Sequence, residues 1–187
     1  MANALYGQIL YADTVGILSK TPVHIMGVNF VPDDVSDTFD LNWWDEANAT
    51  ASSELNITAT ASSGMVTDDD SDHDYLTSSA FADGSVVKVI QTAGDATNKT
   101  YHLVGTAGND DRIIITPTST WADESNIMYH IINYPARPFL NGLQPTATDT
   151  HYSMYWYFGP QGVYLPNLVL ESISTSAYLQ IYLASKF

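Results

Sequence analysis

The stretch Tyr178-Leu179-Gln180-Ile181-Tyr182-Leu183 alternates strictly, with an aliphatic residue at every second position. In an extended chain Leu179, Ile181 and Leu183 therefore share one face, and the residues between them share the other. An alternation of period two predicts a β-strand with one buried face. The stretch 151–158 has the same period, which groups Met154 with Trp156 and places Tyr155 and Tyr157 on the opposite face.

Short stretches of this kind recur along the chain between turn signals such as Ala93-Gly94-Asp95 and Phe158-Gly159-Pro160. The other candidate strands are residues 23–26, 39–43, 55–58, 86–92, 101–105, 112–116, 127–133 and 164–173. Helical periodicity is nearly absent, and the abundance of Tyr, Trp, Thr and Ser with few Lys favours strands. We therefore predict an all-β fold, an antiparallel β-sandwich with either a jelly-roll or an immunoglobulin-like topology.

The predicted sandwich is interrupted in the middle of the chain. Residues 1–58 and 135–187 are expected to form the main β-sandwich. Residues 59–80 are rich in Thr, Ser and Asp, and this composition predicts a polar, acidic loop or linker. Residues 81–134 read as compact hairpins and predict a small β-subdomain inserted between the two halves of the sandwich.

Composition limits the classes of partner. The chain has 187 residues, no cysteine, and 21 acidic against 6 basic residues, for a net charge of -15. An acidic surface repels phosphate backbones and anionic lipids, so we expect neither nucleic acid nor a membrane as partner. The charge suits docking onto a basic surface, although solubility alone explains it equally well. With no signal-like or membrane-spanning segment recognised, we expect a protein made in a cytoplasm.

The run 68–74 resembles a calcium-binding loop in part. Asp68, Asp70 and Asp72 have the alternate spacing of such a loop. His73 stands where the loop needs glycine, however, and Ser79 stands where it needs a bidentate glutamate. We therefore predict a solvated acidic loop, with a calcium ion held by these oxygens as the alternative, and we expect no cofactor.

No catalytic motif is recognised in the sequence. Asp149, His151 and Ser153 supply the residue types of a nucleophilic triad, but no G-x-S-x-G turn is present. The histidines lack zinc-site spacing, and no phosphate-binding glycine loop occurs. We therefore expect the protein not to be an enzyme.

Aromatic residues are the candidate partner-binding residues. One residue of the Trp43-Trp44 pair must leave the core face, and Tyr155 and Tyr157 lie opposite Trp156. Exposed tyrosine and tryptophan side chains stack on sugar rings or form the centre of protein interfaces. The predicted partner-binding residues are Trp44, Tyr155, Tyr157, Tyr178 and Tyr182.

Two stretches carry a resemblance to a known class of protein. One is Thr21-Pro22-Val23-His24-Ile25-Met26-Gly27-Val28-Asn29-Phe30, followed by Asp37-Thr38-Phe39-Asp40-Leu41. The other runs from Gly162 to Ile173 and continues as Ala177-Tyr178-Leu179-Gln180-Ile181-Tyr182-Leu183. Together they cover about a third of the chain and resemble small β-sandwich virion structural proteins of tailed bacteriophages.

The resemblance implies an architectural role in the virion. The expected function is that of a capsid decoration or cement protein, which binds the major capsid protein or other virion proteins as a homo-oligomer. The first alternative is a tail, neck or fibre component that binds host-surface glycans through the aromatic face of a sheet. A free carbohydrate-binding module is a third possibility.

Overall fold

The computed structural model describes residues 3–69, 75–77, 79–91, 98, 100–109, 111–141 and 153–184. These residues form strands and one turn of 3-10 helix, η1 (Thr118–Thr120), which confirms the prediction of an all-β, antiparallel fold. The strands are β1 (Ala4–Tyr6), β2 (Ile9–Ala12), β3 (Gly16–Ser19), β4 (Val23–Val31), β5 (Phe39–Trp44), β6 (Ala51–Thr60), β7 (Met65–Asp68), β8 (Val86–Gln91), β9 (Tyr101–Asn109), β10 (Arg112–Thr116), β11 (Glu124–Tyr134), β12 (Ala136–Asn141), β13 (Met154–Tyr157), β14 (Val163–Leu165), β15 (Leu168–Ile173) and β16 (Tyr178–Leu183).

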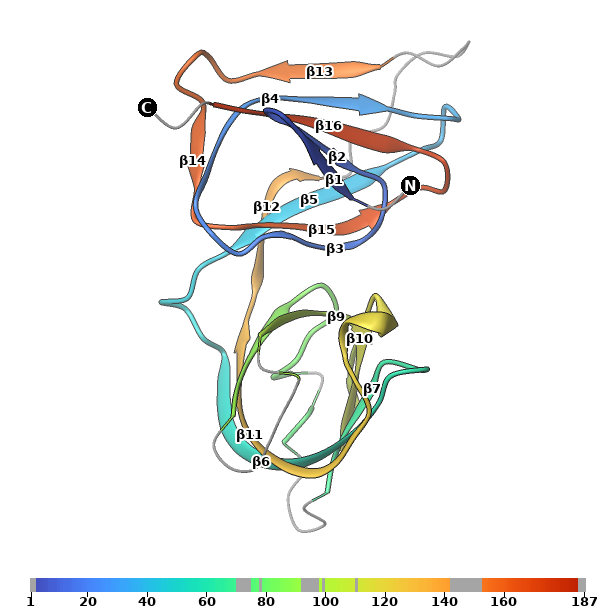
Figure 1. The fold of residues 1–187 in the computed structure, drawn as a ribbon, viewed down its shortest axis with the longest axis vertical. Helices are drawn as coiled ribbons and strands as arrows, with labels where there is room; N and C mark the ends of the chain where they lie inside the picture. Colours follow the sequence, from blue (N-terminus) through green and yellow to red (C-terminus); the bar gives the residue numbers. More distant parts are fainter. Residues whose placement is uncertain are drawn as a thin grey trace. The chain divides into compact units, whose positions relative to one another are not determined.

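The chain divides into two compact units (Figure 1). The sandwich unit consists of Met1–Trp43 and Pro138–Phe187, and the barrel unit is the continuous segment Trp44–Arg137. Each unit has a hydrophobic core of its own. The barrel unit is therefore an insertion into the sandwich unit.

The sandwich unit contains two sheets. The first has the order β1-β2-β16-β4-β13, with β14 also paired to β4, and the second has the order β12-β5-β15-β3. Every pairing in this unit whose register is described is antiparallel. The inner faces form one core, to which Phe30, Phe39 and Leu170 contribute fully buried side chains.

The strand order of the sandwich is that of a jelly roll. Strand β2 pairs with β16, β3 with β15, β4 with β13 and β14, and β5 with β12, so the pairs are nested from the outside of the chain inward. Such nesting is a long hairpin rolled up into two Greek keys. The structure thus selects the jelly roll over the immunoglobulin-like topology. The barrel unit is inserted between β5 and β12, at the tip of this rolled hairpin.

The barrel unit is a closed barrel with the strand order β10-β7-β6-β11-β8-β9. Each of these pairs is antiparallel, and closure gives every strand a hydrogen-bonded neighbour on both sides. Along β6, Leu55, Ile57 and Ala59 face the barrel core and alternate with polar residues. Alternate residues of the strands therefore fill the barrel interior, just as alternate residues form the buried face of each sandwich sheet.

The prediction of a polar linker over residues 59–80 is wrong for residues 59–60 and 65–68, which lie in strands. Strand β6 continues to Thr60, β7 spans Met65–Asp68, and the side chains of Val66 and Leu76 are fully buried. The expected boundary at residue 58 consequently falls inside β6, and residues 44–58 belong to the barrel unit. Small side chains such as Ala59 suffice on the inner face of a narrow barrel, so the stretch lacked the large apolar residues that usually identify a strand.

The predicted calcium loop is described only at its beginning. Asp68 ends β7 and is buried, and its backbone N–H donates to Asp111 O at 2.7 Å, so it does not begin a solvated loop as expected. Residues 70–74 lie outside the described residues. Among the residues that the structure describes, no group of three acidic, His or Cys side chains is placed to hold a metal ion.

Candidate functional site

The outer face of the first sandwich sheet carries a group of tyrosines, here called the tyrosine face. Its members come from β1, β2, β13, β14 and β16 and are Tyr6, Tyr11, Tyr155, Tyr157, Tyr164, Tyr178 and Tyr182. Tyr155, Tyr157 and Tyr164 expose 55%, 61% and 56% of their surface, values far above those of core aromatics. These rings are therefore available to a partner.

The strand register brings the tyrosines of distant segments into rows. Tyr157 lies opposite Gly27 on β4, which in turn lies opposite Tyr182 on β16. Tyr182 is opposite Ile9 of β2, and Ile9 is opposite Tyr6 of β1. Directly opposed residues project from the same side of a sheet. The first and last strands of the chain thus contribute to one surface.

A ladder of side-chain hydrogen bonds runs across the middle of the face. Asn29 Nδ2 donates to Gln180 Oε1 at 3.0 Å, and Gln180 Nε2 donates to Tyr11 Oη at 3.1 Å. Tyr182 Oη also donates to Gln180 Oε1, at 3.2 Å. The ladder links β4, β16 and β2 and orients the phenol groups of Tyr11 and Tyr182.

Tyr155 and Tyr157 form the most exposed part of the face. Their rings lie 6.4 Å apart with an angle of 19° between planes, and the Tyr155 ring meets Tyr182 edge-on at 5.7 Å. Gly27 makes this arrangement possible, because a Cβ at that position would lie 2.6 Å from Tyr155 Oη. The two rings are therefore stacked and nearly parallel in the most exposed part of the face.

A pocket lies at the other end of the face, beside β1, β2 and β16. Its volume is about 630 Å³, within the range of small-molecule sites. The residues that line this tyrosine pocket are Ala4, Tyr6, Tyr11, Asp13, Thr14, Ser176, Ala177, Tyr178 and Gln180. The rings of Tyr6 and Tyr11 are nearly perpendicular, at 83° and 5.5 Å, and Tyr178 lies 6.2 Å from Tyr11.

The structure places four of the five predicted partner-binding residues on the tyrosine face. Tyr155 and Tyr157 lie on β13, and Tyr178 and Tyr182 lie on β16. Trp44 is the exception: it is fully buried and packs against Tyr101 within the barrel unit, with ring centroids 5.5 Å apart. Of the tryptophan pair it is Trp43 that is only half-buried, so the choice between the two was wrong.

The part of the face that comes from β1 and β2 was not predicted. Tyr6 ends β1, the turn at Gly7 and Gln8 follows with a φ of 61° at Gly7, and Tyr11 lies on β2. A glycine turn between two short alternating stretches is a hairpin signal and would have located these strands. The pairing of β2 with β16, however, comes from the tertiary fold.

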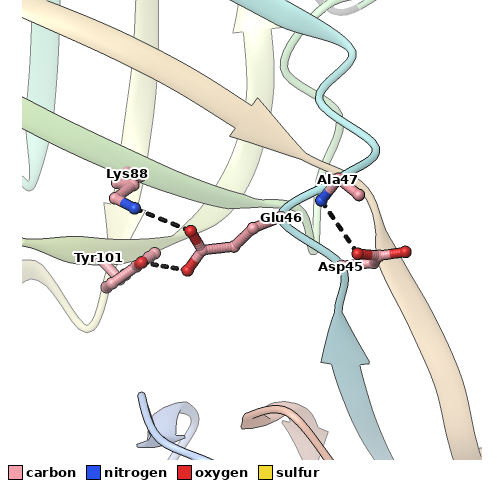
Figure 2. A network of polar contacts seen from close by, with 5 residues as sticks. All are labelled: Asp45, Glu46, Ala47, Lys88 and Tyr101. Atoms are coloured by element: carbon pink, nitrogen blue, oxygen red, sulfur yellow. Dashed lines mark hydrogen bonds and ion pairs between the residues drawn. The ribbon is translucent and has the colours of Figure 1, made fainter.

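A polar network joins the beginning of the barrel unit to strands β8 and β9 (Figure 2). Lys88 Nζ lies 2.8 Å from a Glu46 carboxylate oxygen, and the Tyr101 hydroxyl donates to the other oxygen. Burial alone would raise the pKa of Glu46, but the hydrogen bonds from Lys88 and Tyr101 outweigh burial and hold that pKa below its ordinary value. The Glu46 carboxylate in turn raises the pKa of Lys88.

Asp45 begins the turn that brings Glu46 into place. Its carboxylate accepts from the Ala47 N–H at 3.0 Å (Figure 2). The same carboxylate lies 3.7 Å from the guanidinium of Arg137, the last residue of the barrel unit. Thr50 N donates to Asn133 O at 2.9 Å, so the entering and leaving segments lie side by side. The network therefore stabilises the base of the insertion.

Candidate catalytic groups are few in the described part of the chain. Of the triad residue types, Ser153 is exposed before β13, while Asp149 and His151 lie outside the described residues. On the barrel, Ser52 Oγ and His130 Nε2 lie 2.6 Å apart on an exposed surface. His102 is buried against Trp121, with ring centroids 4.4 Å apart, in a packing role.

The described residues contain no helix long and apolar enough to span a membrane. Comparison of the chain with family models, with curated proteins and with solved structures found no match. The tyrosine face is therefore the feature from which a function is argued.

Proposed function

We propose that this chain is a non-enzymatic structural protein of a tailed-phage particle, a capsid decoration or cement protein that binds the major capsid shell. The proposal combines the resemblance of two stretches to virion structural proteins with the exposed tyrosine face. That face carries the proposal, because tyrosines in a β-sheet offer large contact areas at a low cost in side-chain entropy.

Several features of the face support a role in binding another protein. Tyr155 and Tyr157 are more than half exposed although neighbouring Trp156 packs on the core. Tyr residues are enriched at the centres of protein interfaces, where each buries a broad apolar ring and satisfies a hydroxyl. The net charge of -15 further supports a partner with a basic surface.

The test uses purified particles of the virus that encodes the chain. Cryo-electron microscopy is expected to find the chain in many copies over capsomer junctions, with the tyrosine face against the shell. The double variant Tyr155→Ala and Tyr157→Ala should rebind depleted shells at least about tenfold more weakly, since truncation of a hot-spot tyrosine costs about 2 kcal/mol or more. The matched control is Tyr75→Ala, an exposed tyrosine of the barrel unit. Density confined to the tail, or equal rebinding by both variants, would contradict the proposal.

A second candidate function has one observation in its favour. The rings of Tyr155 and Tyr157 are more than half exposed, and exposed aromatic rings stack on the apolar faces of sugars. A tail or fibre protein that binds host-surface glycans would use these two rings. The measurement is a glycan array. Glycans bound by the wild type but not by the double variant would support this function, and an array without signal would contradict it.

A further inference from the structure

We propose that the outer edge of β13 is a dimerisation site, to which β13 of a second copy of this chain adds in the antiparallel direction. Strand β13 is the last strand of the first sheet, with β4 as its neighbour on the inner side (Figure 1). In the part of the chain that the structure describes, no strand pairs with its other side. Two copies joined there share one continuous sheet. The dimer does not depend on the proposed function, because it uses the backbone edge of β13 and leaves the tyrosine rings on the face of the sheet.

The register of β13 against β4 shows which backbone groups face outward. Phe158 N donates to Met26 O at 2.8 Å, so these two residues form a hydrogen-bonded pair at the end of the ladder. Bonded and non-bonded pairs alternate along an antiparallel ladder, so Trp156 is bonded to β4 while Tyr155 and Tyr157 are not. The N–H and C=O groups of these two tyrosines therefore point away from β4. A row of such groups is a template for another strand.

The other edge strands of the sandwich unit have features that discourage pairing, and β13 lacks these features. Strand β12 contains Arg137 and Pro138, β1 has only three residues, and the pairing of β3 with β15 is irregular. Charge, proline, short length and irregular register are common means by which proteins protect an edge. Strand β13 pairs with β4 without a register shift, and its sequence Met-Tyr-Trp-Tyr contains neither a charged residue nor a proline.

Charge favours a second copy of the chain as the partner at this edge. The net charge of -15 makes two copies repel each other over most of their surfaces. The sequence from Thr150 to Leu170, which includes β13 and β14, contains no Asp, Glu, Lys or Arg, and neither does β4. Two copies therefore repel each other least where these strands meet. A basic partner, by contrast, finds no carboxylate in these strands to pair with.

The sequence of β13 fits a twofold axis. When Trp156 lies opposite Trp156 of the second copy, Tyr155 of each strand lies opposite Tyr157 of the other. Both tyrosines have outward backbone groups, so this register forms two hydrogen-bonded pairs, whereas a shift by two residues leaves one such pair within β13. A twofold interface requires this kind of self-complementarity. The four tyrosine rings then project from one face of the joined sheet, where opposed aromatic side chains stabilise a strand pair.

The first experiment measures the association of the full chain by sedimentation velocity, over protein concentrations that bracket the expected dissociation constant. We expect a reversible monomer–dimer equilibrium with a dissociation constant on the order of 10–100 μM, because a four-residue edge buries less area than a standard interface. Raising the salt concentration should strengthen the dimer, since salt screens the repulsion between two acidic copies. A chain that stays monomeric at the highest protein and salt concentrations overturns the proposal.

Amide hydrogen exchange of the full chain locates the interface. The amides of Tyr155 and Tyr157 should exchange at least about tenfold more slowly well above the dissociation constant than well below it, because they gain acceptors only in the dimer. The amide of Trp156 faces β4 and should be protected equally at both concentrations. A dimer in which the amides of Tyr155 and Tyr157 stay unprotected forms through another surface and overturns the proposal.

Three double variants test the register, and all of them remove the same two exposed rings. Tyr155→Glu with Tyr157→Glu places like charges opposite each other, whereas Tyr155→Lys with Tyr157→Glu places unlike charges opposite each other. The first variant should dimerise at least about tenfold more weakly than the second. The third variant, Tyr155→Lys with Tyr157→Lys, makes the whole chain less acidic but should also dimerise more weakly than the second, because like charges again face each other.

The comparison of the variants separates the register from the overall charge. If overall charge alone controlled association, the third variant would form the strongest dimer of the three. That result, or equal dissociation constants for the first two variants, overturns the proposal.

Discussion

Gly27 connects the backbone of β4 with the tyrosine face above it. A Cβ at this position would lie 2.8 Å from Trp156 O as well as 2.6 Å from Tyr155 Oη. Atoms closer than 3.0 Å would have to move, and one of these two atoms, Trp156 O, belongs to the backbone of β13. A residue without a side chain therefore permits both the close pairing of β13 with β4 and the position of the Tyr155 ring.

Replacement of this glycine is expected to be costly. Gly27→Ala should lower the free energy of unfolding by about 1–3 kcal/mol, the usual cost of overpacking. Urea unfolding measures the change. Combining it with Tyr155→Ala should restore only part of the loss, because the contact with Trp156 O is unaffected. Full restoration in the double variant would show that the ring alone opposes the alanine.

Glu46 links stability to pH in a predictable direction. The pKa of Glu46 is lowered in the folded protein from an ordinary value of 4.5. Its contribution to the free energy of unfolding is therefore complete above pH 4.5 and is lost as pH falls through the folded pKa. The pKa of Lys88 is raised in the folded protein, so the contribution of Lys88 to the free energy of unfolding is complete below about 10.5 and is lost as pH rises above that value. The network is therefore most stabilising between these two limits.

Glu46→Gln is the corresponding variant. The amide of glutamine is uncharged and has one acceptor oxygen where the carboxylate has two. We therefore expect the free energy of unfolding at pH 7 to fall by about 0.5–1 kcal/mol, a small change because the ion pair is partly exposed. The measurement is unfolding by urea between pH 3 and 8. The difference between wild type and variant should shrink as pH falls below about 4.5. A difference that is constant across this range would contradict an electrostatic origin.

Strand β16 contributes both to the sandwich core and to the tyrosine face. Leu179 and Ile181 are fully buried in the sandwich core, while Tyr178, Gln180 and Tyr182 belong to the outer face. The strand lies between β2 and β4, so it is central in the sheet. One strand therefore stabilises the sandwich with one set of residues and contributes to the tyrosine face with the other.

Substitutions on the two faces of β16 should have very different effects. Ile181→Ala removes a fully buried side chain and should lower the free energy of unfolding by about 2–5 kcal/mol. Tyr182→Phe removes one hydrogen bond at the surface and should cost about 1 kcal/mol or less. Thermal or urea unfolding compares them. Similar losses in the two variants would mean that the outer face is packed as tightly as the core.

The whole molecule combines a jelly roll with a barrel inserted at its innermost loop. The barrel has a closed set of hydrogen-bonded strands, a core of its own and ends that lie side by side. A segment with these three properties meets the usual criteria for a domain. The sandwich in turn keeps its nested strand pairs on either side of the insertion.

The barrel unit is expected to fold alone. A fragment of residues 44–137 should give dispersed amide resonances and a cooperative thermal transition, because it retains all of its core and both ends of the network around Glu46. NMR and calorimetry are the measurements. A fragment with native strand content but no cooperative transition would show that the barrel depends on the sandwich.

The sequence by itself determined most of the strands and, within them, which residues share a face. The alternation in 178–183 and in 154–157 correctly assigned which side chains face the core, because a period of two is a local property of an extended chain. It missed the short strands β1, β2, β3 and β12. It also failed at residues 59–68, where small side chains face the barrel interior, and at Trp44, where alternation does not say which unit receives the ring.

Only the tertiary structure decided the order of the strands and the place where the tyrosines meet. Tyr11 and Gln180 are bonded although 169 positions separate them, and nothing local in either stretch encodes that pairing. The nested pairing that makes the jelly roll depends on how two sheets bury their apolar faces together. The tyrosine pocket, built from both ends of the described chain, follows from that burial and from the register it imposes.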